Sequence, residues 1–285
     1  MNNIKKNRLK DQAFKYWGIF CTLLGLVLLA IFIGTILIDG LQRINWDFIT
    51  NLPSRNADKA GIYTALTGSV WILGLTTLIA LPLGIAAAIY LEEYAKKGKL
   101  SSILEINISN LAGVPSIIYG LLGLEVFVRI LEMGSSVLAG SFTLALLILP
   151  IVIVSTREAI KAVPKSIRDA SYAMGASKWQ TVSMQLLPAS FGGILTGVIL
   201  SLSRAVGETA PLIVIGALAY VPFAPSSPMD EFSVLPIQIF NWISRPQKGF
   251  EVNAAAAIII LLLITFLLNA VAVYFRNRWQ KKLNN

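Results

Sequence analysis

Long apolar stretches separated by shorter polar segments run through the whole chain. A helix needs about 20 apolar residues to cross the hydrocarbon core of a bilayer. The first and last long stretches contain no charged residue, whereas Pro115, Glu125 and Arg129 interrupt the third. The pattern predicts an all-α, polytopic membrane protein with six transmembrane helices. The six stretches lie at 17–38, 65–91, 106–131, 138–156, 190–218 and 254–275.

Lys and Arg residues outside these stretches are divided unequally between the two sides of such a bundle. The side that holds both termini and the loop 157–189 carries 17 of them, and the opposite side carries five. Because short loops rich in Lys and Arg stay in the cytoplasm, we expect both termini there. The membrane domain then spans residues 17–275, with basic tails at 1–16 and 276–285. The net charge of +9 reflects this topology and contact with lipid headgroups, not nucleic-acid binding.

The composition excludes several kinds of functional site. Only 14% of the residues are charged and the mean hydropathy is +0.70, whereas soluble domains contain about 25% charged residues. The chain has no His and a single Cys, Cys21. These counts exclude His-dependent catalytic triads, intrachain disulfides and Cys-rich or His-rich metal sites. We therefore expect neither a catalytic site nor a cofactor or metal bound by this chain.

Two pairs of opposite charge lie within the apolar stretches, each with a spacing of four residues. Arg204 and Glu208 lie near the centre of the fifth stretch, on one face of a continuous helix. Ionisable groups in mid-membrane are costly, which makes both candidates for function. Arg204 can line a path for an anion, with Glu208 holding it, or the two can form a structural ion pair. The residues alone favour neither interpretation.

The second pair, Glu125 and Arg129, lies near the outer end of the third stretch. Arg129 can extend its charged group to the membrane surface. For this pair the residues favour a structural role, although both side chains are also candidates for lining a translocation pathway.

Two loops are long enough to carry structure of their own. Helical spacing in loop 157–189, interrupted by Gly175, predicts a helix, a turn and a second helix that ends at Pro188. Such a hairpin can dock into the groove of another protein or pack on its own bundle. Loop 219–253 contains five Pro residues, and within it residues 234–243 are expected to form a short interfacial helix anchored by Trp242.

Residues 169–188 resemble the EAA loop of ABC-importer permeases. The family pattern is Glu-Ala-Ala, three residues, Gly, nine residues and Ile-x-Leu-Pro. Asp169, Ala170 and Ser171 are followed at these intervals by Gly175 and by Gln185 to Pro188. Asp replaces Glu, Ser replaces the second Ala, and Gln replaces Ile. Four further segments, 113–120, 143–159, 203–212 and 235–242, resemble the permeases of bacterial phosphate importers, so the resemblance extends over roughly residues 60–275.

The resemblance implies a six-span permease subunit of an ABC importer for inorganic phosphate in the bacterial inner membrane. Implied partners are a homologous C-type permease, two ATPase subunits that hold ATP and magnesium, and an extracytoplasmic phosphate-binding protein. The chain has no G-x-x-x-x-G-K-[ST] loop with which to bind ATP itself. An ABC permease for sulfate or molybdate and a secondary anion carrier remain the alternatives.

The resemblance also assigns site residues. It implies that the phosphate route is lined by Arg204 and Glu208. It assigns contact with the ATPase to the loop residues Asp169, Ala170, Ser171, Gly175, Leu187 and Pro188.

Overall fold

The computed structural model describes residues 2–96, 98–217 and 220–283, and its regular structure there is helical apart from one isolated bridge between Ser136 and Glu231. The expectation of an all-α, polytopic membrane protein is confirmed. A pair of helices that bends by 102° gives a sixth candidate span, Lys99–Leu111 with Ser116–Ile130. The five other segments long and apolar enough to cross a membrane are Lys10–Leu41, Tyr63–Tyr94, Val137–Lys161, Lys178–Gly207 and Lys248–Arg278.

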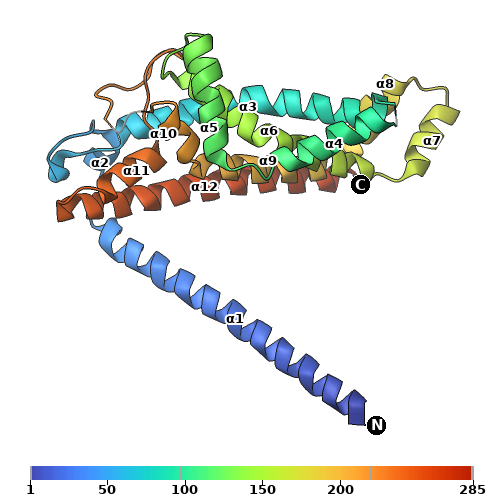
Figure 1. Ribbon diagram of the computed structural model, residues 1–285, viewed down its shortest axis with the longest axis horizontal. Helices are drawn as coiled ribbons and strands as arrows, with labels where there is room; N and C mark the ends of the chain where they lie inside the picture. Colours follow the sequence, from blue (N-terminus) through green and yellow to red (C-terminus); the bar gives the residue numbers. More distant parts are fainter. Residues whose placement is uncertain (1, 97, 218–219, 284–285) are drawn as a thin grey trace.

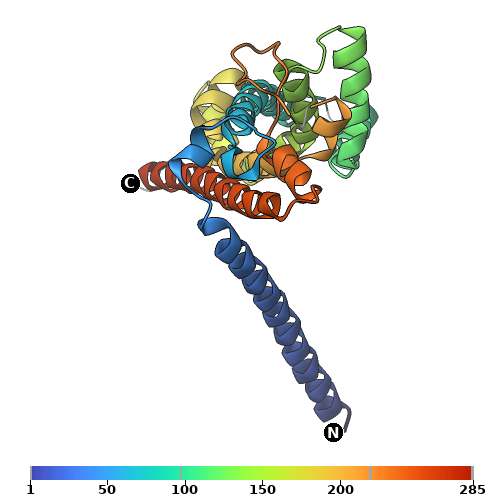
Figure 2. The same cartoon turned by 90° about the vertical axis from the view of Figure 1, so that its left-hand side faces the viewer.

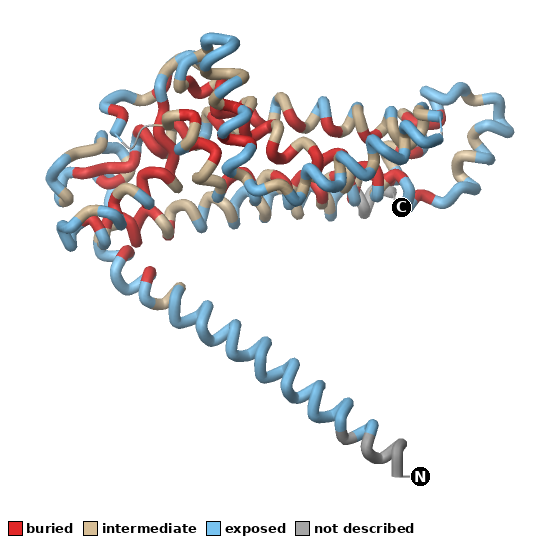
Figure 3. The backbone as a smooth tube through the Cα atoms, in the orientation of Figure 1, coloured by how far each residue is buried: buried red, intermediate tan, exposed pale blue. Residues whose placement is uncertain are grey.

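Four long helices lie lengthwise against one another in the body of the molecule (Figure 1). Helix α6 (Val137–Lys161) is the central one and packs on α3 (Tyr63–Ile89) and on α9 (Leu187–Gly207). Helix α12 (Lys248–Leu283) packs along α9. Buried residues follow this body and are concentrated between its helices (Figure 3).

Helix α1 (Asn2–Leu41) projects away from the body, as two perpendicular views show (Figures 1 and 2). It contacts α12 near its C-terminal end, where Ile36 packs with Ala255 and Ile259. Only 6% of its most apolar 18-residue window is buried. Lipid or another protein chain must therefore cover most of this helix.

The third predicted span, 106–131, falls on the bent pair and is not a single straight helix. Helix α4 (Lys99–Leu111) ends before Gly113, and the chain turns by 102° into α5 (Ser116–Gly123) and the π-helical segment η3 (Leu124–Ile130). Pro115 causes the break, because the residue before a proline is disfavoured in the α conformation.

The fifth predicted span, 190–218, is also interrupted. Its helix begins earlier, at α8 (Lys178–Thr181) and the π-helical η4 (Val182–Leu186), and it ends at Gly207. Glu208 has an extended backbone, with φ −74° and ψ 122°, and a separate turn, α10 (Ala210–Val214), follows. Glu208 therefore caps the end of α9 and does not lie within a helix.

One end of the body, here called the cap end, consists of α2 (Trp46–Thr50), the short 3-10 helix η1 (Ala57–Lys59) and α11 (Leu235–Ile243). The helix predicted at 234–243 is confirmed as α11. Trp242, however, is not an interfacial anchor, because it is 1% exposed and packs against Phe48 and Phe250.

The opposite end, here called the hairpin end, carries α7 (Lys165–Ala173), α8 and the π-helical η2 (Tyr90–Tyr94). Loop 157–189 folds as the predicted helix, turn and helix. The turn has Gly175 at φ +81°, a conformation that favours glycine. Ser177 then begins α8 with a capping box that includes Gln180.

The two predicted tails extend the neighbouring helices. Residues 2–16 belong to α1 and residues 276–283 to α12. Residues 1, 284 and 285 of these tails, and position 219 of the loop 219–253, lie outside the described residues.

Candidate translocation site

Arg204 lies in the last turn of α9, and Glu208 follows at the cap position. Arg204 Nε donates a hydrogen bond to Glu208 Oε1 over 3.1 Å. The side chain of Arg204 is 39% exposed and that of Glu208 is 16% exposed. Across the described part of the chain, neither terminal guanidinium nitrogen of Arg204 has a hydrogen-bond partner. A guanidinium has five N–H donors, so most of the donors of Arg204 remain open.

The two short helices that follow the breaks, α5 and α10, pack against each other beside this pair. Gly120 of α5 lies so close to Pro211 of α10 that an added Cβ would come within 2.7 Å of its Cα. Tyr119 is buried in the same cluster as Ala205, the residue next to Arg204, and donates a hydrogen bond to the carbonyl of Leu111 over 2.9 Å. Interrupted membrane helices commonly form substrate sites, because their ends expose polar backbone groups. The sequence interpretation did not bring these two segments together.

Small residues determine which face of α9 is packed. Gly193, Gly197, Ser201 and Ala205 follow one another at intervals of four, a spacing typical of helix contacts in membranes. A Cβ atom on Gly193 or Gly197 would collide with Ala159 or Ser155, both of which belong to α6. This stripe is therefore packed against α6.

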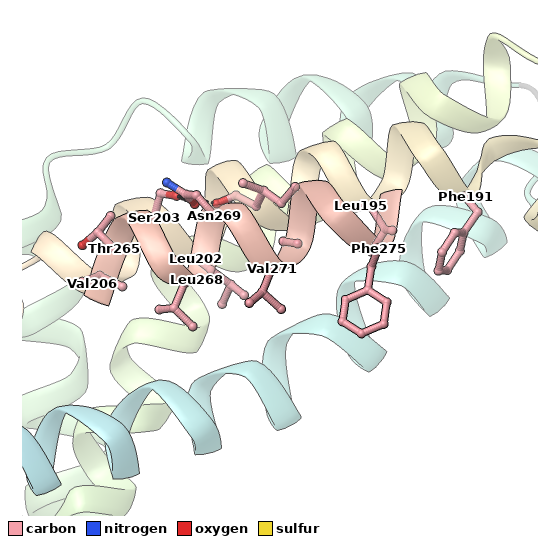
Figure 4. Close-up of a pocket in the computed structure, with 12 residues that line it drawn as sticks. Phe191, Leu195, Leu202, Ser203, Val206, Thr265, Leu268, Asn269, Val271 and Phe275 are labelled. Carbon is pink, nitrogen blue, oxygen red and sulfur yellow. Dashed lines mark hydrogen bonds between the residues drawn. The ribbon is translucent and has the colours of Figure 1, made fainter. Parts of the chain in front are cut away.

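A second face of α9 is turned toward α12. Ser203 and Asn269 point toward each other across the two helices, and Ser203 Oγ lies 2.6 Å from Asn269 Oδ1 (Figure 4). An apolar groove of about 460 Å³ runs between the helices here, and Arg204 does not line it. Arg204 thus lies on a third face, which this chain leaves partly uncovered.

Glu125 and Arg129 form a separate pair at the surface. Arg129 Nη1 lies 3.0 Å from Glu125 Oε2. The side chain of Arg129 is 65% exposed and that of Glu125 is 58% exposed. They belong to η3 and make no contact with Arg204. Both side chains are largely exposed, and no hydrogen bond or ion pair among the described residues joins them to the Arg204 site.

The predicted contact loop stands at the hairpin end (Figure 1). Asp169 and Ala170 are exposed on α7, and Ser171 Oγ lies 2.9 Å from Thr181 Oγ1 of α8. An open groove of about 660 Å³ lies between α7 and η4. Leu187 and Pro188 begin α9 and are half-buried, so they hold the base of the hairpin and contribute little surface.

A network of ion pairs lies beneath this hairpin and is not predicted by the sequence, in which the basic residues of this loop indicate only topology. Three acidic side chains from η2 and α4 pair with three basic side chains from α6 and α7. The pairs are Glu92–Arg157, Glu105–Arg157, Glu105–Lys161 and Glu93–Arg168. Among the described residues, no group of three or more Asp, Glu, Cys or His side chains is arranged to hold a metal ion.

Comparison with known proteins shows the following similarities. The family described as binding-protein-dependent transport system inner membrane component matches residues 80–281. The probable ABC transporter permease protein YqgI of Bacillus subtilis is 31% identical over 281 residues, which cover 94% of this chain and 95% of that protein. The phosphate transport system permease protein PstA of Haemophilus influenzae is 34% identical over 247 residues, covering 87% of this chain and 86% of that protein.

A solved structure of a bacterial alginate ABC transporter, in complex with an alginate pentasaccharide-bound periplasmic protein, contains a chain of similar fold. The TM-score is 0.67 with 14% identity, over 92% of this chain and 94% of that chain. The likeness extends over nearly the whole length of both chains and concerns the fold.

Proposed function

The chain belongs to the family of inner membrane components of binding-protein-dependent transport systems, and we propose that it is the member that carries inorganic phosphate into the cell. It is an ABC importer permease and a multi-pass membrane protein. The 34% identity to a relative named as a phosphate transport permease supports phosphate as the substrate.

The observation that carries the proposal is the open guanidinium of Arg204 at a helix break. Phosphate bears one to two negative charges at neutral pH, and an unpaired charge is costly to transfer into hydrocarbon. A guanidinium stays charged and can bind two oxyanion oxygens at once. Glu208 engages only Nε, so it orients the side chain and leaves the terminal nitrogens for a ligand. Its negative charge also weakens the hold on the anion, as release requires.

A second permease would complete the pathway. The face of α9 that carries Arg204 is partly exposed, and α1 is exposed along almost its whole length. A homologous C-type permease that covers these surfaces would enclose the anion route and supply further donors. One Arg alone does not neutralise a divalent phosphate.

The energy would come from two partner ATPase subunits that bind ATP and magnesium. Because the chain has no nucleotide-binding loop of its own, ATP-driven movement must reach it through a contact. The exposed residues Asp169 and Ala170 on α7, with Gly175 at the turn, form the surface we assign to that contact. The excess of Lys and Arg on this side supports a cytoplasmic location of the hairpin end.

The cap end would then face outward and receive the phosphate-binding protein. The buried Phe48, Trp242 and Phe250 make this end a rigid platform. We place the whole assembly in the bacterial inner membrane, in accordance with the family description.

The test is uptake of labelled phosphate into vesicles that contain this chain and its co-purified partners, with the binding protein outside. ATP is trapped inside one set of vesicles and omitted from a matched set. Excess unlabelled phosphate, sulfate or molybdate is added as a competitor. We expect uptake only with ATP, and blocked only by phosphate.

Two other results would contradict parts of the proposal. Competition by sulfate or molybdate would retain the ABC importer and change its substrate. Uptake that is indifferent to ATP would indicate a secondary carrier and would leave the α7 contact without a role.

A further inference from the structure

The guanidinium of Arg168 joins three helical segments at the hairpin end. Its Nε and Nη2 donate to Glu93 Oε1 of η2 over 3.1 and 2.9 Å. Its Nη2 also donates to the carbonyl of Ile160, and Nη1 to that of Val163, over 2.9 and 2.8 Å. Ile160 is in the last turn of α6, where helix carbonyls lack intrahelical partners. Arg168, which belongs to α7, therefore binds the end of α6 and the segment η2, which directly continues α3, together.

This pair is shielded from solvent. The side chain of Glu93 is 9% exposed and that of Arg168 is 16% exposed. Water competes weakly with hydrogen bonds at such sites, and breaking one partner leaves an uncompensated charge. The contact is therefore more specific than the surface pairs of this chain.

The residue before Arg168 makes the apolar part of the same attachment. Ile167 packs against a buried cluster of Val163, Val182 and Leu186, which Ile89 of α3 also joins. The helix α7 is thus fixed by two adjacent residues, one apolar toward η4 and one charged toward η2.

The neighbouring carboxylate, Glu92, extends the connection to α6. It pairs with Arg157, whose side chain is 8% exposed. Arg157 also binds Glu105 of α4 over 3.1 Å. Consecutive carboxylates of η2 therefore hold α7 and α6, and these ion pairs join the ends of α4 and α6 and the segment η2 to the hairpin.

We propose that Arg168 and Glu93 are positioning residues that transmit displacement of α7 directly to α3 and α6. Without them, movement would reach the bundle only along the chain, through residues 162–164 into α6 and through α8 and η4 into α9, and through the apolar contact of Ile167. The proposal rests on the ATPase contact assigned to α7 above. The residues act on transport through the helices and touch neither phosphate nor ATP.

The first experiment measures position without any transport. Spin labels are placed at Lys96→Cys, beside η2, and at Met174→Cys, which is 88% exposed beyond α7, in a Cys21→Ser background and in the complex with its partners. We expect a narrow distribution of label distances that broadens in Glu93→Gln and in Arg168→Gln. The control is Glu158→Gln, because Glu158 is 65% exposed and pairs only with Lys161 within the described structure. An unchanged distribution in both variants would overturn the proposal.

The second experiment measures phosphate taken up per ATP hydrolysed, in vesicles with equal amounts of inserted complex. For each single variant we expect this ratio to fall about fivefold or more, with the ATPase subunits still bound and hydrolysing. The variant Arg168→Lys, which keeps the charge and loses the planar guanidinium, should lie between Arg168→Gln and the unaltered protein. Glu158→Gln should retain the full ratio.

The double variant Glu93→Gln with Arg168→Gln separates a shared role from two independent ones. If the two residues act through each other, the double variant should be no worse than the more severe single variant. Losses that multiply would overturn the pairing. Failure of the unaltered protein to bind an ATPase or to couple ATP to uptake would contradict the proposed function instead, so the two failures are distinguishable.

Discussion

Arg168–Glu93 and Arg204–Glu208 are the same chemical pair in two different settings. Each has its Nε 3.1 Å from a carboxylate oxygen. Arg168 makes four hydrogen bonds and is 16% exposed, whereas Arg204 makes one and is 39% exposed. The guanidinium of Arg168 has its hydrogen-bond donors occupied by acceptors of its own chain and joins helical segments. The guanidinium of Arg204 leaves its terminal nitrogens without hydrogen-bond partners among the described residues, so the two pairs differ in how many guanidinium donors are occupied and not in the pairing itself.

The backbone around each Arg explains this difference. Arg168 lies against the end of α6, where the carbonyls of Ile160, in the last turn, and of Val163, just beyond the helix, accept two of its hydrogen bonds. Arg204 also lies in the last turn of a helix, α9. There the helix ends at Gly207 and the chain continues with the extended Glu208, and no backbone carbonyl accepts a hydrogen bond from Arg204 among the described residues. A positive charge is stabilised at both helix ends by the helix dipole. Only at the first are the carbonyls directed at the guanidinium.

The largest effect is expected from removing the open guanidinium. Arg204→Gln should lower phosphate uptake by about a hundredfold or more, because loss of one charged partner from a desolvated contact typically costs that much affinity. Arg204→Lys should retain part of the uptake. Labelled-phosphate uptake is the measurement, with assembly checked by co-purification of the partners. Arg129→Gln is the matched control, since that Arg has the same spacing from a Glu and lies at the surface. Full uptake in Arg204→Gln would assign Arg204 a purely structural role.

The next effect concerns the turn that presents α7. Gly175→Val forces a branched side chain into φ +81°, a conformation that costs roughly 1–2 kcal/mol for an L-residue. We expect the complex to insert while ATP hydrolysis and phosphate uptake become uncoupled, as measured by the ratio of the two rates.

Gly134→Val is the control for that strain. Gly134 has φ +63°, open space at its Cβ position, and lies between η3 and α6, far along the chain from α7. It should show comparable strain and normal coupling. Equal loss of coupling in both variants would attribute the effect to general destabilisation.

A smaller effect is expected from the packing that supports Arg204. Gly197→Leu introduces a side chain where Ser155 of α6 already touches the glycine. Overpacking of this kind costs about 1–3 kcal/mol. The temperature of thermal unfolding in detergent should fall, and uptake at low temperature should fall much less than in Arg204→Gln. A drop in uptake as large as in Arg204→Gln, with unfolding unchanged, would show that the α6–α9 contact itself controls transport.

The smallest effect is expected at Asp230, whose carboxylate accepts three hydrogen bonds although it is not buried. The backbone N–H groups of Ser226 and Ser227 and the Ser226 hydroxyl donate to Asp230 over 2.8 to 3.0 Å and lower the pKa of Asp230 below its ordinary value of 3.8. The stabilisation is therefore complete above pH 3.8 and is lost as the pH falls through the lowered folded-state pKa. The difference in thermal stability between Asp230→Asn and the unaltered protein should be constant at neutral pH and vanish in strong acid. A difference that persists in strong acid would show that the charge of Asp230 is not its cause.

Local patterns in the sequence predicted the features that depend on neighbours in the chain. Hydrophobic length predicted the membrane segments, and the spacing around Gly175 predicted the hairpin with α7 and α8. Arg204 and Glu208 were found because charge is rare in apolar stretches. Their spacing of four alone was not decisive, since Glu125 and Arg129 share it and lie at the surface.

The features that were missed depend on distant segments or on breaks in a helix. Glu93 and Arg168 are separated by 75 positions, so their contact arises only from the packing of α3, α6 and α7. Pro115 was recognised as an interruption of the third stretch, but the hydrophobic pattern contains neither the direction of the turn there nor the end of α9 at Gly207. That the helices following the two breaks meet at Gly120 and Pro211 is a property of the folded chain.

The central claim is that Arg204 offers a positive charge to a travelling anion, and chemical replacement of that charge tests it most directly. In a Cys21→Ser background, Arg204→Cys is treated with a cationic thiol reagent or with a neutral reagent of similar size, and phosphate uptake is measured. We predict that the cationic reagent restores part of the lost uptake, that the neutral one does not, and that phosphate slows the modification. Equal recovery with both reagents, or no protection by phosphate, would contradict the account.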